Sequence, residues 1–152
     1  MALSAPATRA DTPARHRVII DTSTLIGAML RTRSLPSAVL TWVLDNCLLY
    51  ASNATLTELA QVVQRDGFDK YLGLPERTRF FQQYATRATV VEPLVAVADC
   101  RDPKDNKFLE LALHVRADVL VSSDEDLRSL HPWRGIAVLN PAEFVEWSGR
   151  GG

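Results

Sequence analysis

Acidic side chains recur where apolar runs of this chain give way to helix-like patterns. Asp21 follows "RVII", Glu58 lies in "TLTELAQVVQR", Asp105 lies in "CRDPKDNKFLELAL" and Asp124 follows "VLVSS". Carboxylate oxygens are the ligands that Mg²⁺ and Mn²⁺ prefer. A divalent ion held by several of them can polarise a phosphodiester and lower the pKa of a bound water. Such hydrolysis requires that the fold bring these residues together.

Each of these acids also has a purely structural explanation. Asp21 could cap the helix that follows its strand, and Thr55 to Glu58 fits a capping box in which Glu58 accepts from the Thr55 amide. Asp102 precedes a proline, which is a typical helix start, and the acids at 124–126 would complement a helix N-terminus. For any one acid taken alone, capping is the simpler interpretation.

The positions of the acids argue for a shared role. Asp21 and Asp124 come at the carboxyl ends of predicted strands, and Glu58 belongs to the helix that follows another strand. The carboxyl edge of an open α/β sheet carries the ligand crevice. Asp105 shares a helical face with apolar residues and should point toward the core, whereas Asp102 is interpreted as the cap. Carboxylates directed at one crevice repel one another unless a proton or cation compensates, which favours a metal site.

Short apolar segments alternate with helical patterns along the chain. The predicted strands cover residues 17–21, 47–52, 89–92, 118–123 and 136–139. The predicted helices cover residues 22–30, 36–46, 55–65, 75–87, 103–115, 124–130 and 141–147. This alternation predicts an α/β sandwich with a mainly parallel central sheet flanked by helices. We expect one domain over residues 17–148, a disordered N-terminal arm over 1–16 and a flexible tail over 149–152.

Composition excludes several classes of protein. With 152 residues, 47% of them hydrophobic, the chain suits a single globular domain. A net charge of −1 gives no basic surplus, so any nucleic-acid contact must come from local arrangement. No apolar run approaches the roughly 18 residues that span a bilayer, and the N-terminus lacks the apolar core of a signal peptide. We therefore expect a cytoplasmic protein that does not bind membranes, with Cys47 and Cys100 reduced.

Five segments in order resemble the PIN-domain family, and most closely its VapC-like branch, the toxin ribonucleases of bacterial type II toxin–antitoxin systems. The segments are "VIIDTSTLIGAML", "ATLTELAQVVQRDGFDKYL", "CRDPKDNKFLELAL", "VLVSSDEDLRSL" and "IAVLNPAEFV". They cover nearly everything from Arg17 to Trp147, and although each motif is weak alone, their order is specific. The resemblance implies a three-layer PIN fold and an endoribonuclease that hydrolyses RNA with Mg²⁺ or Mn²⁺ as cofactor.

The resemblance also implies the site residues by position. The four family acids fall on Asp21, Glu58, Asp105 and Asp124, further metal-ligand candidates are Asp102 and Asp126, and the supporting hydroxyl residues are Thr22, Ser23 and Ser122. Candidate RNA contacts are the basic residues close in sequence to these ligands, Arg31, Arg33, Lys104 and Lys107, although plain solvation is the simpler interpretation of each. Toxins of this family often form homodimers and are inhibited by a cognate antitoxin, so we expect both partners.

Two departures from the family pattern and two rival functions remain. Many members carry Asn where this chain has Ser23, and relatives often carry a basic residue where it has Gly67. A haloacid-dehalogenase-like phosphohydrolase would need a second Asp two residues after Asp21, and Ser23 stands there instead. The other rival is a non-catalytic PIN-like module that binds RNA or a partner protein. Retention of all the acids argues against that module.

Overall fold

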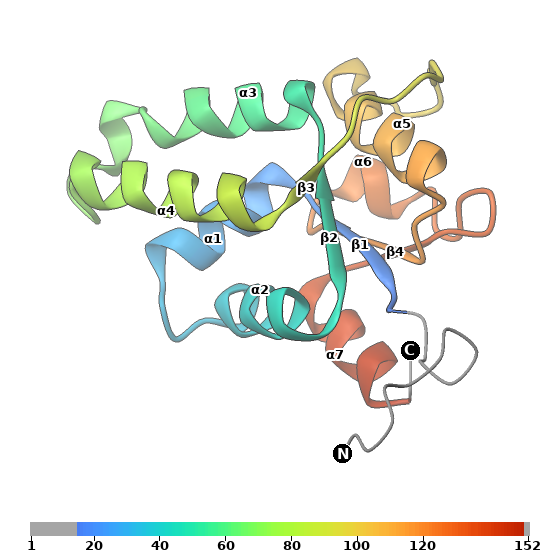
Figure 1. The fold of residues 1–152 in the computed structure, drawn as a ribbon, viewed down its shortest axis with the longest axis horizontal. Helices are drawn as coiled ribbons and strands as arrows, with labels where there is room; N and C mark the ends of the chain where they lie inside the picture. The colour runs from blue at the N-terminus through green and yellow to red at the C-terminus, as the bar shows by residue number, and fades with distance from the viewer. Residues whose placement is uncertain (1–14, 151–152) are drawn as a thin grey trace, which may run out of the picture.

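A five-stranded sheet forms the centre of the computed structural model, which describes residues 15–150 (Figure 1). The strands are β1 (Arg17–Ile20), β2 (Leu48–Ala51), β3 (Thr89–Val90), β4 (Val119–Val121) and β5 (Ala137–Leu139). Their order is β3-β2-β1-β4-β5, and every neighbouring pair of these strands is parallel. The α/β prediction with a mainly parallel sheet is confirmed.

Helices cover both faces of this sheet. They are α1 (Thr22–Leu30), α2 (Leu35–Asn46), α3 (Asn53–Val63), α4 (Leu74–Arg87), α5 (Asn106–Val115), α6 (Glu125–Arg128) and α7 (Pro141–Gly149). Two 3₁₀ turns, η1 (Asp66–Phe68) and η2 (Pro103–Asp105), precede α4 and α5. Each strand and each α-helix lies close to a predicted one, η1 was not predicted, and the strands are one or more residues shorter than predicted.

The apolar strands alternate between two cores, and this alternation builds three layers. In β1, Val18 and Ile20 enter one core while Ile19 enters the other. The first core takes its helical residues from α1, α2, α3, α4 and α7, and the second takes them from α5 and α6. Figure 1 shows α5 and α6 together, on the side away from α2. Parallel strands buried on both faces explain why these segments are continuous apolar runs.

The start of α3 differs from the prediction. Ser52 is the N-cap: its hydroxyl accepts from the amide of Thr55 at 3.2 Å, and Thr55 Oγ1 accepts from the amide of Ser52 at 2.9 Å. The predicted capping box from Thr55 to Glu58 is therefore wrong. β2 ends at Ala51, so the chain already has the extended backbone of a cap at Ser52, and the helix begins before Thr55. Glu58 consequently lies one turn inside the helix with its carboxylate free for other contacts.

Just before α5, Asp102 acts as a cap and Asp105 does not. Asp102 caps η2 by accepting from the amide of Lys104 at 3.1 Å, which confirms its interpretation as a helix-start residue. Asp105 occupies the N-cap position of α5 but its side chain accepts no capping hydrogen bond. Pro103 occupies the first position of η2, where its missing N–H costs no hydrogen bond. The Asp105 carboxylate is left without a local backbone partner.

The described residues bear on the predicted ends of the domain. Residues 1–14 of the predicted arm and residues 151–152 of the predicted tail lie outside the part of the chain that the structure describes. His16 accepts a backbone hydrogen bond from Leu48 and its ring packs edge-on against Trp147. Helix α7 continues through Gly149, where the tail was expected to begin. Over residues 15–150, no helix is long and apolar enough to cross a membrane.

Candidate active site

A cavity of about 350 Å³ opens at the carboxyl edge of the sheet. The four predicted acids all line it: Asp21, Glu58, Asp105 and Asp124. Strand β1 has β2 on one side and β4 on the other, so the chain connections diverge at this point. Ligands of open α/β sheets bind at such a switch point. The topology thus brings together acids that are up to 103 residues apart in sequence.

Asp21 is held rigidly at the end of β1. Its backbone amide donates to the carbonyl of Val121 at 3.0 Å, which continues the pairing between β1 and β4. Its Oδ1 accepts from the amide of Thr24 at 3.0 Å and so caps α1, while Oδ2 accepts from the hydroxyl of Ser122 at 2.5 Å. The side chain is only 3% exposed. This burial raises the pKa of Asp21, and the hydrogen bonds from Ser122 and Thr24 partly oppose that rise.

Ser122 links the two acids that follow strands. Its hydroxyl donates to Asp21 and accepts from the backbone amide of Asp124 at 2.9 Å. Asp124 in turn caps α6, because its Oδ2 accepts from the amide of Leu127 at 3.2 Å. Ser122 is fully buried, so its hydroxyl has lost water and depends on these two partners. The predicted supporting role of Ser122 therefore has a geometric basis.

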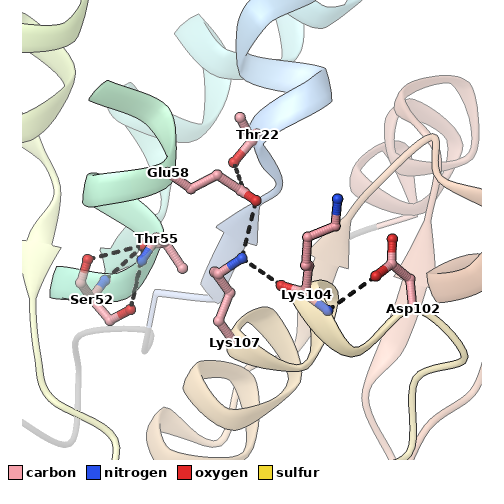
Figure 2. A network of polar contacts seen from close by, with 7 residues as sticks. All are labelled: Thr22, Ser52, Thr55, Glu58, Asp102, Lys104 and Lys107. Atoms are coloured by element: carbon pink, nitrogen blue, oxygen red, sulfur yellow. Dashed lines mark hydrogen bonds and ion pairs between the residues drawn. The ribbon is translucent and has the colours of Figure 1, made fainter. Parts of the chain in front are cut away.

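Glu58 reaches the cavity from α3 and is held only by side chains (Figure 2). Its Oε1 accepts from the hydroxyl of Thr22 at 2.5 Å, and its Oε2 forms an ion pair with Lys107 Nζ at 3.0 Å. Lys107 also donates to the carbonyl of Lys104, which fixes the ammonium group above the start of α5. Figure 2 shows Lys107 extending from α5 across to α3. The carboxylate thus has partial charge compensation from within the chain.

The pKa of Asp105 is also raised. Burial, the neighbouring Asp124 carboxylate, and the charges of Asp102 and Glu58 raise the pKa of Asp105 to about 7. Carboxylates that crowd one another in this way are stabilised either by a proton or by a cation.

The donor set fits a hard divalent ion. Mg²⁺ is typically held by one or two carboxylates and completes its octahedron with water, for which the cavity has room. Asp105 and Asp124 provide such a pair, and Asp21 and Glu58 line the same space. Over residues 15–150, however, no three acidic, His or Cys side chains come close enough to form a complete metal-binding cluster. A divalent ion held here would therefore take two carboxylates from the chain and its remaining ligands from water.

The other predicted site residues divide into two groups. Thr22 and Ser23 line the cavity, and Ser23 Oγ lies 3.3 Å from both carboxylate oxygens of Asp21. The remaining candidates do not line it. Asp102 is a cap, Asp126 lies 3.9 Å from Arg101, Arg33 lines a separate cavity beside Trp42, and Arg31 and Lys104 are exposed. Of the basic candidates, Lys107 alone contacts one of the four acids.

Five cavity-lining residues were not among the predicted site residues: Ile26, Val62, Arg65, Phe68 and Phe108. Arg65 and Phe68 come from the turn between α3 and α4. A signal for Arg65 was present: Glu58, Val62 and Arg65 are spaced i, i+4 and i+7, which places them on one helical face. Phe68 follows in η1, where no periodic pattern identifies the face of a side chain.

Comparisons with known proteins agree with this geometry. The profile of the PIN domain family matches residues 17–126. The uncharacterized protein MJ1680 of Methanocaldococcus jannaschii is 26% identical over 140 residues, covering 86% of this chain and 90% of that protein. The chain therefore belongs to the PIN domain family, which is a nuclease-type fold.

Solved structures show the same fold at low sequence identity. PAE2754 from Pyrobaculum aerophilum superposes with a TM-score of 0.60 at 14% identity, covering 88% of this chain and 90% of that one. VapBC2 from Rickettsia felis, bound to a DNA fragment from its promoter, gives 0.57 at 12% identity, with coverages of 82% and 98%. DNA-bound VapBC from Salmonella typhimurium gives 0.56 at 17% identity, with coverages of 83% and 98%.

Proposed function

We propose that this protein is a Mg²⁺- or Mn²⁺-dependent endoribonuclease. The observation that carries the proposal is the convergence of Asp21, Glu58, Asp105 and Asp124 on one cavity at the switch point of the sheet. Helix capping does not account for this set, because the side chains of Glu58 and Asp105 cap no helix. Membership in the PIN domain family supports phosphodiester hydrolysis as the reaction class.

The residues of the chain divide the chemical tasks. Asp105 and Asp124 would hold the ion, with Asp21 and Glu58 available directly or through water, and the bound ion would supply an activated water and polarise the phosphate. Ser122 orients Asp21, and Thr22 and Lys107 orient Glu58. Burial beside the sheet edge lowers the local dielectric, which strengthens the attraction between these carboxylates and a cation.

A non-catalytic RNA-binding module is the second candidate. It is favoured by one observation: Glu58 is already paired with Lys107, and no three acids form a complete cluster within residues 15–150. In such a module the acids would hold their protons or their internal ion pair and no ion would be required. The two candidates therefore differ in their response to a divalent ion. The ion should change the melting temperature and the RNA cleavage of the enzyme, and neither property of the binding module.

We also propose that the chain is a toxin component with a cognate antitoxin and that it forms a homodimer. The support is the PIN domain together with the fold shared with the VapBC structures. Light scattering should then give about twice the 16.8 kDa of one chain. Co-expression with a small DNA-binding protein encoded next to its gene should suppress RNA cleavage. A monomer whose cleavage no such protein suppresses would contradict the toxin assignment.

One experiment separates the enzyme from the binding module. Millimolar Mg²⁺ or Mn²⁺ should raise the melting temperature of the wild-type chain, because an ion that binds only the folded state stabilises it by RT ln(1 + [L]/Kd), about 2.7 kcal/mol at 100 Kd. The shift should vanish in the Asp21→Asn/Asp105→Asn double variant. Single-stranded RNA should be cut and duplex DNA spared, and EDTA should abolish cleavage. RNA binding that continues without cleavage and without a metal-dependent shift would establish the binding module.

A further inference from the structure

Arg65 lies at the rim of the acidic cavity and has no partner there. It is the one basic residue among the side chains that line the cavity in the described part of the chain. Within residues 15–150, its guanidinium forms no ion pair, although Glu58 and Asp105 line the same space. Arg65 is exposed, whereas Lys107 of α5 is already paired with Glu58. Arg65 therefore keeps its hydrogen-bond donors available for a bound anion.

The backbone that carries Arg65 is fixed by a second arginine. Arg77 of α4 is only 1% exposed, and its Nε donates to the carbonyl of Val63 at 2.8 Å. Its Nη1 donates to Asp69 at 3.0 Å and to the carbonyl of Leu72, and its Nη2 donates to the carbonyl of Arg65 at 3.4 Å. A buried cation that binds carbonyls on both sides of a turn holds that turn in one conformation. Such fixing lowers the entropy lost when Arg65 binds a ligand.

Phe68 adds an apolar surface to the same turn. It lines the cavity and packs partly against the main core, and its amide donates to the carbonyl of Arg65 at 3.2 Å. An aromatic ring and a guanidinium that line one cavity match a nucleotide, because a ring can stack on a base while a guanidinium binds a phosphate. The turn from Arg65 to Phe68 thus has both parts of a nucleotide subsite beside the acids.

We propose that the turn from Arg65 to Phe68 is an RNA-binding subsite in which Arg65 binds a phosphate flanking the one that is cleaved. This inference rests on the proposed function, since it takes RNA as the ligand. A basic group is needed near the acids, because four carboxylates repel the RNA backbone wherever a metal does not compensate. Arg65 supplies that charge without neutralising a metal-ligand carboxylate, as Lys107 does for Glu58.

The test compares Arg65→Gln with Arg79→Gln in single-turnover cleavage of a fluorescein-labelled single-stranded RNA in Mg²⁺. Arg79 is also exposed but lines a different cavity, between α2 and α4. Arg65→Gln should raise the half-saturating protein concentration about tenfold, because a charge-assisted hydrogen bond to phosphate is lost. Its maximum rate should change less than threefold, and the slope of log affinity against log salt should shrink by about 0.7. Arg79→Gln should match the wild type.

Further variants keep the result interpretable. Arg65→Lys keeps the charge but loses the planar fork, so the salt slope should recover while affinity recovers only in part. Melting curves should show Arg65→Gln as stable as the wild type, since only the Arg65 carbonyl is bound by Arg77. Binding of the same RNA is also measured by anisotropy in the Asp105→Asn background, where cleavage is blocked.

The outcomes separate this subsite from the proposed function. If the wild type cleaves RNA and Arg65→Gln behaves like Arg79→Gln in binding and cleavage, the subsite is overturned and the ribonuclease stands. Binding that depends on Arg65 in a chain that never cleaves RNA would support the subsite and overturn the ribonuclease. A chain that binds no single-stranded RNA would overturn both.

Discussion

The two acids that follow strands are held differently from the two that helices carry. Asp21 and Asp124 each cap a helix through a backbone amide, and Ser122 joins them by a shared hydroxyl. Glu58 and Asp105 make no capping bond. Glu58 is held by the side chains of Thr22 and Lys107, and the pKa of Asp105 is raised by burial and by the acids around it. The first pair is therefore part of the scaffold. The second pair, Glu58 and Asp105, is held by no capping bond, and we call it the adjustable pair.

This difference shows how one site can combine rigidity with a changeable charge. A capping carboxylate stabilises its helix whether or not a ligand is present, so the fold itself fixes Asp21 and Asp124. An acid without such a bond adds repulsion to the folded state until a proton or cation arrives. Asp105 meets this description, because neighbouring carboxylates raise its pKa to about 7. Substitutions can test whether the two pairs share a function while differing in their effect on stability.

The largest effect is expected on RNA cleavage, where substitutions in either pair of acids should have the same consequence. Asp21→Asn, Glu58→Gln, Asp105→Asn and Asp124→Asn each keep size and hydrogen bonding but remove a charge from the cavity. Each should lower the single-turnover RNA cleavage rate by about 100-fold or more, because in the proposed function all four acids would position the metal-bound water. Near wild-type cleavage by any one variant would remove that acid from the site.

The next effect concerns pH, and Asp105 should contribute to it together with Asp21, whose pKa is also raised by burial. The unfolded pKa of Asp105 is about 3.8 and the folded value is about 7, so the folded state binds the proton more tightly. The stabilisation that the Asp105 proton gives the metal-free protein is then fully present below pH 4 and is lost as pH rises toward 7. The loss should be spread over this pH range, because the proton leaves Asp105 earlier in the unfolded state than in the folded state. Urea midpoints in EDTA between pH 4 and 8 measure it.

A matched variant makes this pH test specific. Asp105→Asn cannot ionise, so its urea midpoint in EDTA should decline less between pH 4 and 7 than that of the wild type. Addition of Mg²⁺ should flatten the wild-type profile, because the cation replaces the proton as the compensating charge. Identical slopes for the wild type and Asp105→Asn would show that the Asp105 carboxyl is not perturbed.

Much of this arrangement could be predicted from the sequence. Apolar runs followed by Asp21 and Asp124 gave strand ends, and parallel topology put those ends on one edge. The spacing of Asp105 from Phe108 and Leu109 predicted a carboxylate facing the core side, and Asp105 lines the cavity next to Phe108. These predictions succeeded because periodicity and strand polarity depend on local residues.

The rest depended on contacts between distant segments. The capping box was placed at Thr55 because its pattern fits there, but the length of β2 decided in favour of Ser52. The pair between Lys107 and Glu58 joins α5 to α3, and no spacing within either helix predicts it. Arg65 enters the cavity because Arg77 fixes the turn from another helix. Tertiary packing determines the cap, the ion pair and the position of Arg65, and a single sequence does not reveal that packing.

Alanine substitutions should separate the two pairs by stability. Asp21→Ala and Asp124→Ala each remove a cap, and Asp21→Ala also leaves the buried Ser122 hydroxyl without an acceptor. Each should cost about 1–2 kcal/mol in unfolding free energy at pH 7. Asp105→Ala removes repulsion and no cap, so the metal-free protein should be as stable as the wild type or more so. Equal destabilisation by all three would refute the distinction between scaffold and adjustable acids.

The smallest effect is expected at Asp102. Its substitution tests whether a capping acid and a cavity-lining acid can be told apart when they are only three residues apart. Asp102 caps η2, while Asp105 lines the cavity. Asparagine caps nearly as well as aspartate, so Asp102→Asn should change the unfolding free energy by no more than a few tenths of a kcal/mol. Its charge raises the pKa of Asp105, so removal should lower that pKa slightly and leave cleavage within a few-fold of the wild type. Asp105→Asn should have the opposite profile, with cleavage lost and stability kept. If instead Asp102→Asn abolished cleavage and Asp105→Asn retained it, the metal would lie at the 3₁₀ turn rather than in the cavity, because the acid that caps would also be the acid that binds.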